Sequence, residues 1–141
     1  MAAPSALSKL LATLKPVLSG PSFVFTTFGP NQPIPPSLPV QMMFREAEGT
    51  TLVTTRAAAD IENIHYHGVN RLITLNMDPP SDDLIFHIAF LLKKLEDSNI
   101  DVSHVSGCSH DYLFVQLGSE EATLKCLEEV VREAQEDVKG E

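Results

Sequence analysis

Side chains that could bind a metal or move a proton gather in one short stretch of the 141-residue chain. His104, Cys108, His110 and Asp111 lie within eight residues. Zinc binds imidazole, thiolate and carboxylate, and an imidazole held by a carboxylate can act as a general base. The paired ligand spacing of zinc sites is absent, and adjacent residues of a strand point to opposite faces. We therefore expect no metal site, and we interpret Asp111 or Ser109 as capping a turn.

Two histidines of this stretch, His104 and His110, are kept as candidate ligand contacts. An enzyme that uses His110, Asp111 and His104 is an alternative, and it requires the three side chains to converge on one pocket. A separate His65-x-His67 pair shares one face if it is extended, but no third ligand is evident. Phosphate-binding glycine loops and the common hydrolase motifs are absent. We expect no cofactor and no enzymatic activity.

The elements that position the first group follow from hydrophobic spacing in the second half of the chain. The sequence predicts a strand, a helix, two strands and a final helix, over residues 71–77, 82–97, 100–106, 112–117 and from 119 to about 135. This order is the split βαβ, ferredoxin-like arrangement without its last strand. The place beside strand 71–77 must be filled, because an open apolar edge is a liability. The N-terminal half is the obvious donor.

The N-terminal half is predicted to hold one helix and three strands. These are a helix over 5–18 that ends near Pro16, a strand over 22–28, strands over 40–45 and 50–55 joined in a hairpin, and one or two helical turns within 56–64. Five prolines within 29–39 predict an exposed loop. Phe86 and Phe90 add a second apolar face to helix 82–97, so either the N-terminal half or another subunit packs there.

Charge and composition exclude several classes of protein. The chain has 10 Lys and Arg against 19 Asp and Glu, a net charge of −9. A nucleic-acid partner is not expected, because such proteins present a basic face. No apolar run is long enough to span a membrane, so no membrane partner is expected either. Two cysteines are too few for a disulfide framework and indicate a reducing compartment, which predicts a cytoplasmic protein.

Several segments resemble the small stand-alone ACT-domain proteins that carry two ACT-like halves. They are SFVFTTF, MFREAEGTTLV, RLITLNM, the stretch from DLIFHIAF to SHDYLFVQ, and EEATLKCLEEV. The resemblance implies an α+β, ferredoxin-like βαββαβ sandwich, with antiparallel strands and helices on one face. It divides the chain into an N-terminal ACT-like half (1–68), a C-terminal ACT domain (69–136) and a frayed tail (137–141).

The resemblance also implies a regulatory module that binds a small amino-acid-like metabolite between modules or subunits. One wall of such a site is the turn after the first strand, here Asn76 to Asp82. Amides at a helix N-terminus with Ser81 as cap can bind a carboxylate, and Asp78 can accept an ammonium. Arg71 could clamp a carboxylate. The expected ligand-binding residues are Asn76, Asp78, Ser81, Asp82, His104, His110 and Arg71.

This sequence departs from the usual ACT pattern at that turn. Pro79-Pro80 stands where a Pro-Gly is usual, which removes two amides and stiffens the loop. The alternative is therefore a module that binds no ligand and serves self-association or protein interaction. In both cases the resemblance implies a homodimer or higher homo-oligomer.

Overall fold

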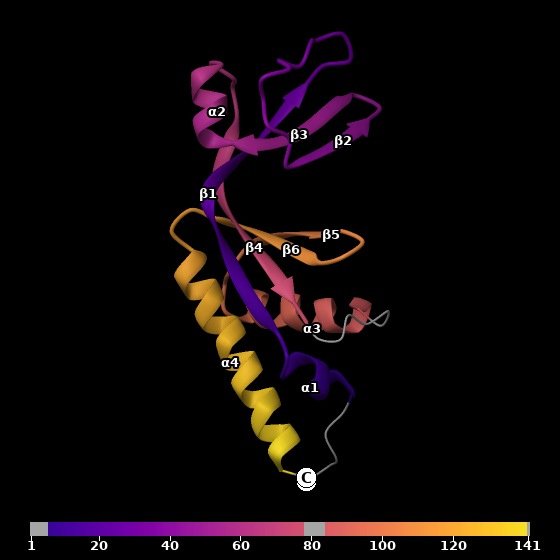
Figure 1. The fold of residues 1–141 in the computed structure, drawn as a ribbon, viewed down its shortest axis with the longest axis vertical. Helices are drawn as coiled ribbons and strands as arrows, with labels where there is room; N and C mark the ends of the chain where they lie inside the picture. The colour runs from indigo at the N-terminus through magenta and orange to yellow at the C-terminus, as the bar shows by residue number, and fades with distance from the viewer. Residues whose placement is uncertain (1–5, 78–83, 141) are drawn as a thin grey trace. The chain divides into compact units, whose positions relative to one another are not determined.

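The computed structural model describes residues 6–77 and 84–140 (Figure 1). The chain forms two compact units, one from residues 1–18 with 73–141 and the other from residues 19–72. In chain order the elements are α1 (Ala6–Leu11), β1 (Lys15–Phe28), β2 (Met42–Glu46), β3 (Gly49–Thr55), α2 (Arg56–Ile61), β4 (His67–Asn76), α3 (Leu84–Asp97), β5 (Val102–Ser106), β6 (Asp111–Gln116) and α4 (Glu120–Lys139). The α+β class predicted from the sequence is confirmed.

The strand order is β2-β3-β1-β4-β6-β5, and β1 and β4 contribute residues to both units. The Asn76 side chain donates to the carbonyl of Lys15, and the Arg71 side chain donates to that of Ser19. The residue numbers of the partners in β4 therefore decrease as those in β1 increase, which indicates that the two strands are antiparallel. The predicted vacancy beside β4 is filled by β1, so the prediction that an upstream strand completes the ferredoxin-like layer is confirmed.

In the unit of residues 1–18 and 73–141, strands β1, β4, β6 and β5 are covered by helices α1, α3 and α4 (Figure 1). The apolar face of α4 explains this packing, because Leu127, Val130 and Ala134 recur at helical spacing and are buried. They join buried residues of α1, α3 and the strands in one core, among them Leu11, Leu14, Ile73, Leu75, Leu91, Leu95, Leu113 and Val115. Phe90 of α3 packs against this core, and α1 contacts α3. The N-terminal segment thus covers part of the second apolar face predicted for that helix.

In the unit of residues 19–72, the β2–β3 hairpin pairs Glu46 with Gly49, so that Ala47 and Glu48 form the turn. Gly49 has a φ of 148°, and a Cβ there would lie 2.1 Å from the carbonyl oxygen of Phe28. Only glycine permits this approach of the turn to the end of β1. The proline-rich segment forms the predicted loop, and it packs its buried Leu38 against Phe28 and Leu52.

The prediction of a helix over residues 5–18 is wrong, because α1 ends at Leu11 and β1 begins at Lys15. The leucine spacing fits a helix, yet Leu14 is buried just before β1 and Leu18 is partly buried within β1. Pro16 therefore lies inside a strand instead of ending a helix. The pairing of β1 with β3 begins only at Phe23, so the first part of β1 has β4 on one side alone. Strands with one partner tolerate proline.

Other bounds shift by less. β4 begins at His67, before the predicted start at residue 71, and α4 continues to Lys139, past the predicted end of the helix. An Arg132–Glu136 ion pair of 3.0 Å and a hydrogen bond from Gln135 to the carbonyl of Ala12 hold the last turns. The proposed N-cap Ser81 lies outside the described residues. The division into consecutive halves at 68/69 stays a prediction.

Candidate functional site

Asp111 is the most buried acidic side chain of the described residues, with 2% of its surface exposed. Its Oδ1 accepts a hydrogen bond of 2.5 Å from Ser106 Oγ and lies 2.9 Å from Nε2 of His104. The hairpin register explains this contact, because Ser106 pairs with Asp111 and His104 pairs with Leu113 on the same face. The arrangement holds the imidazole of His104 in one orientation, with 22% of its side chain exposed.

The turn at the tip of this hairpin is closed by the backbone. The amide of Gly107 donates to the carbonyl of His110 at 2.9 Å. The interpretation of Asp111 as the cap of the turn is wrong, since its carboxylate bonds to the side chains of His104 and Ser106. In a tight turn the backbone already satisfies itself, and the carboxylate is free to accept from the neighbouring strand.

His110 lies apart from the His104–Asp111 contact. Its exposed ring packs edge-on against Tyr112, with ring centroids 6.3 Å apart. No hydrogen bond within the described part of the chain joins His110 to His104 or Asp111. The structure thus brings two of the three hairpin residues together. The enzyme alternative required all three in one pocket, and this arrangement does not provide it.

Arg71 and Asn76 both fasten β4 to β1. Arg71 Nη2 donates to the carbonyl of Ser19 at 2.9 Å, and Asn76 Nδ2 donates to that of Lys15 at 3.2 Å. An odd spacing of five along a strand places the two side chains on opposite faces, so they do not form one site. The Arg71 Nε is buried without a hydrogen-bond partner. The remaining expected residues of this site, Asp78, Ser81 and Asp82, lie outside the described residues.

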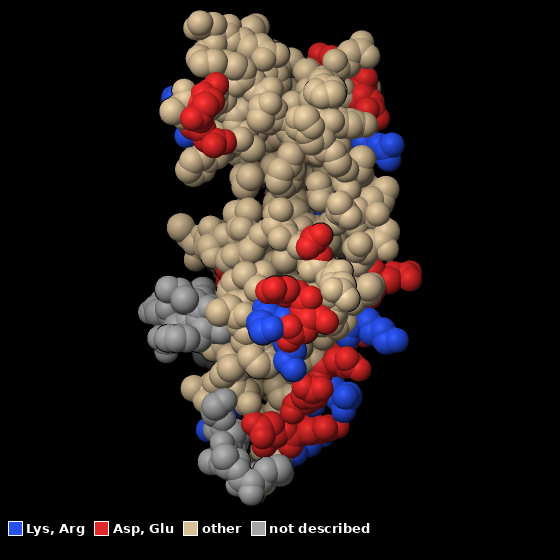
Figure 2. Space-filling view, turned by 180° about the vertical axis from the view of Figure 1, so that it is seen from behind, with Lys and Arg blue, Asp and Glu red and all other residues tan. Residues whose placement is uncertain are grey.

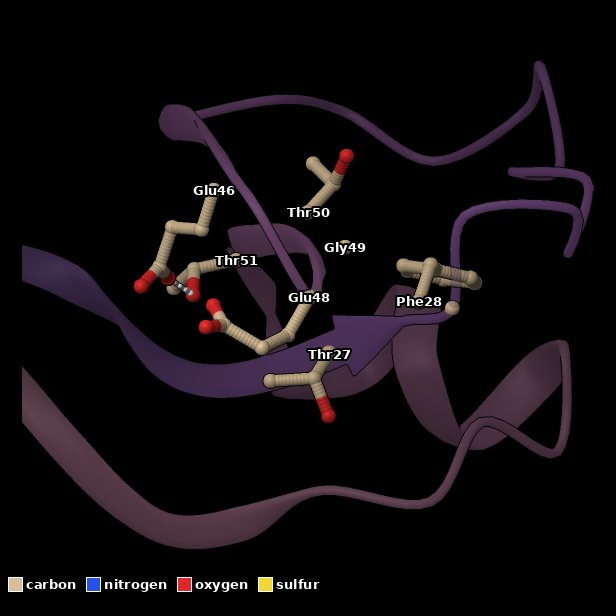
Figure 3. A pocket seen from close by; sticks show the side chains of 8 residues that line it. Thr27, Phe28, Glu46, Glu48, Gly49, Thr50 and Thr51 are labelled. Carbon is tan, nitrogen blue, oxygen red and sulfur yellow. Dashed lines mark hydrogen bonds between the residues drawn. The ribbon is translucent and has the colours of Figure 1, made fainter.

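Sequence reasoning missed a hollow of about 330 Å³ where the end of β1 meets the β2–β3 hairpin (Figure 3). Glu46 and Glu48 direct their carboxylates to the same side, and Thr51 Oγ1 donates to Glu46 (Figure 3). The floor includes Phe28 and Gly29. The signal available in the sequence was Glu46-x-Glu48 before Gly49, two acids on one side of a tight hairpin. Such a rim favours cations over anions.

Other titratable groups are scattered over the described residues. The rings of His65 and His67 meet edge-on at 5.3 Å, and no group of three or more His, Cys, Asp or Glu side chains in residues 6–77 and 84–140 could hold a metal ion. Both cysteines are free. The pKa of the exposed Lys93 is raised, first because its ammonium donates to Asp97 at 2.5 Å and then because of the charge of Asp97.

None of the helices in the described part of the chain is both long and apolar enough to cross a membrane.

Comparison with known proteins gives the domain type. Residues 3–71 match the model of the ACT domain. A structure of a protein of unknown function from Vibrio cholerae, described as a possible transport protein, is 28% identical with a TM-score of 0.77, covering 89% of this chain and 96% of that one. No curated protein matches the sequence.

Two aspartate kinase structures share the fold at lower identity. A putative C-terminal regulatory domain of aspartate kinase from Porphyromonas gingivalis is 13% identical with a TM-score of 0.55, over 84% of this chain and 96% of that one. The aspartate kinase of Clostridium acetobutylicum, an allosteric enzyme, is 9% identical with a TM-score of 0.56, over 84% of this chain and 34% of that one. The resemblance seen in the sequence is confirmed for residues 3–71, which match the ACT domain model.

Proposed function

We propose that this protein is a non-catalytic regulatory module that binds a small amino-acid-like ligand. The observation that carries the proposal is the ACT domain match over residues 3–71, together with a fold that aspartate kinase regulatory domains share. The two free cysteines suit a reducing compartment, and we propose a cytoplasmic location.

Arg71 is the described residue that best suits the carboxylate of such a ligand. It is partly exposed, and among the described residues no carboxylate pairs with it. Its hydrogen bond to Ser19 fixes the guanidinium, and a planar guanidinium held in place binds a carboxylate with little loss of side-chain entropy. Asn76 lies on the opposite face of β4 from Arg71, so Asn76, Asp78, Ser81 and Asp82 stay a separate group of proposed contacts, in which Asp78 is the proposed acceptor for an ammonium. His104, oriented by Asp111, and the exposed His110 stay proposed contacts.

A thermal-shift screen with the twenty amino acids tests the proposal. A ligand at 100 times its Kd stabilises the folded state by about 2.7 kcal/mol, which raises Tm by several degrees for a chain of this size. Arg71→Gln should abolish the ligand-induced shift. Arg56→Gln is the matched control, because Arg56 is exposed and pairs only weakly with Asp60, at 3.9 Å. Flat melting temperatures across the screen would contradict ligand binding.

The second candidate function is self-association without a ligand, and the exposure of the edge strand β2 favours it. β2 is the last strand in the order on its side, and four of its five residues are exposed. Met43 and Phe44 are neighbours on opposite faces of the strand, 47% and 65% exposed. An apolar edge strand with both faces open is a template for pairing. A second copy pairing antiparallel about Phe44 would match all of β2 and place the two Phe44 rings across from each other.

Light scattering on the purified chain separates the two functions. We expect a dimer that Phe44→Glu converts to a monomer. Ile61→Glu, at a residue of α2 that is 79% exposed, removes a comparable apolar side chain and should leave the dimer intact. A wild-type monomer at high concentration would refute self-association through β2 and leave the ligand proposal standing.

A further inference from the structure

A second hollow, of about 260 Å³, lies among the three helices of the unit formed by residues 1–18 and 73–141. It is separate from the residues proposed above for the amino-acid-like ligand. Its floor is apolar and its rim is acidic: Leu7 and Leu11 come from α1, Phe90 from α3, and Val130, Glu133 and Asp137 from α4. The spacing on α4 places its three residues on one face of that helix.

Among the described residues, the two carboxylates at the rim have no partner of opposite charge. Glu133 and Asp137 make no hydrogen bond or ion pair in the part of the chain that the structure describes. The nearby Arg132 pairs with Glu136 at 3.0 Å, and the described residues that line the hollow include no Lys or Arg. Lys94, whose Nζ lies 5.5 Å from the ring centre of Phe90, is not among the lining residues.

The surroundings strengthen the negative charge. Acidic side chains lie along the lower part of the face shown in Figure 2, with Lys and Arg side chains among them. The sequence of α4 holds seven acids and three bases. Like charges four residues apart destabilise a helix, so Glu133 and Asp137 cost stability unless a cation lies between them. Nothing in the described fold supplies that cation.

We infer that this hollow binds a small organic ammonium ion on an apolar stem, such as an arylalkyl or branched alkyl amine. The hydrocarbon lies against Leu7, Leu11 and Phe90, and the ammonium lies between Glu133 and Asp137. The volume suits a ligand smaller than a drug-sized molecule. An amino acid with the same side chain binds more weakly, because its carboxylate faces two acids and meets no basic residue.

Amide chemical-shift titration with 2-phenylethylamine tests this site. We expect saturable shifts confined to α1, the middle of α3 and the C-terminal half of α4, with a Kd of about 1–10 mM, as expected for nine non-hydrogen atoms. Phenylalanine and 3-phenylpropionate should shift these amides far less. Loss of both ion pairs, in Glu133→Gln/Asp137→Asn, should weaken binding about fivefold.

The matched control is Glu121→Gln/Glu128→Gln, which removes the same charge from exposed positions of α4 that do not line the hollow. Its Kd should stay within about twofold of the wild type. Absence of saturable shifts, equal binding of 3-phenylpropionate, or equal weakening in both double variants would each overturn the inference. None of these results bears on the amino-acid ligand proposed above, which is tested by Arg71→Gln.

Discussion

In the unit of residues 1–18 and 73–141 three helices pack over the strands, whereas in residues 19–72 the described cover is the six-residue α2 and a proline-rich loop. Both units contain part of β1 and part of β4. The first unit has two long amphipathic helices, α3 and α4, in which apolar residues recur at helical spacing. In the second, Pro30, Pro33, Pro35, Pro36 and Pro39 make a helix impossible between β1 and β2.

This difference shows how far a loop can replace a helix in covering the strands of a sheet. Leu38 supplies a buried anchor on Phe28 and Leu52, with Ile34 packed beside it. No residue of β2 belongs to this cluster, and the residues of β2 stay largely exposed. A helix covers several strands with a continuous apolar face, while a loop covers only the strand under each anchor. The exposed β2 is therefore the part of the fold most suited to a partner.

The largest expected effect is in the helical core. Leu95→Ala removes a fully buried side chain of α3 and leaves a cavity between helix and strands. We expect the free energy of unfolding to fall by about 3.5 kcal/mol in urea denaturation. Leu117→Ala, at a side chain that is 47% exposed, is the control and should change it little. A loss below about 1 kcal/mol for Leu95→Ala would mean that this core is not closely packed.

The buried leucine of the proline-rich loop, Leu38, should contribute less to stability than Leu95. Leu38→Ala also removes a buried leucine, but the loop can close over the space, so we expect a loss of about 2 kcal/mol. Urea denaturation of both variants under the same conditions gives the difference directly. If Leu38→Ala lowered the free energy of unfolding as much as Leu95→Ala, the loop would stabilise its unit as strongly as the helices stabilise theirs. The proposed difference between the loop and the helices would then be wrong.

The buried carboxylate of the β5–β6 hairpin comes next. Asp111→Asn keeps the shape but exchanges charge-assisted hydrogen bonds from His104 and Ser106 for neutral ones. We expect a loss of about 1 kcal/mol at pH 7. Asp101→Asn, at an exposed position just before β5, is the control. Equal stability of the two variants would show that the hairpin does not depend on the carboxylate.

The smallest effect belongs to the surface of α4. Arg132→Ala breaks an exposed ion pair with Glu136, and we expect about 0.3 kcal/mol, declining further in 1 M salt. Thermal denaturation at low and high salt measures it. A loss above about 1 kcal/mol would indicate that the last turns of α4 depend on this pair more than on Ala134 and Gln135.

The second half of the fold could be predicted because its signals agree. Apolar spacing, turn residues and helix-start residues point to the same five elements from β4 to α4. The start of β1 could not be predicted, because the leucines before it fit one face of a helix. They are Leu7, Leu10, Leu11 and Leu14. Tertiary pairing with β4 overrode that local pattern, and only the need for a fourth strand hinted at it.

The candidate site was predictable in part. The contact of His104 with Asp111 follows from the hairpin register, and that register is determined once residues 107–110 form the turn. The use of Asn76 and Arg71 to hold β1 depends on the strand that the sequence misassigned. Both hollows arise where elements distant in sequence meet, and the local pattern Glu46-x-Glu48 indicates only the acidic rim of the one at the β2–β3 hairpin.

Nuclear Overhauser contacts between residues 15–19 and residues 71–76 in a uniformly labelled sample test the pairing of β1 with β4. We expect cross-strand contacts that pair Lys15 with Asn76 and Ser19 with Arg71, in line with the hydrogen bonds between them. Sequential helical contacts from Ala6 through Leu18, with none to β4, would show instead that no upstream strand completes the layer.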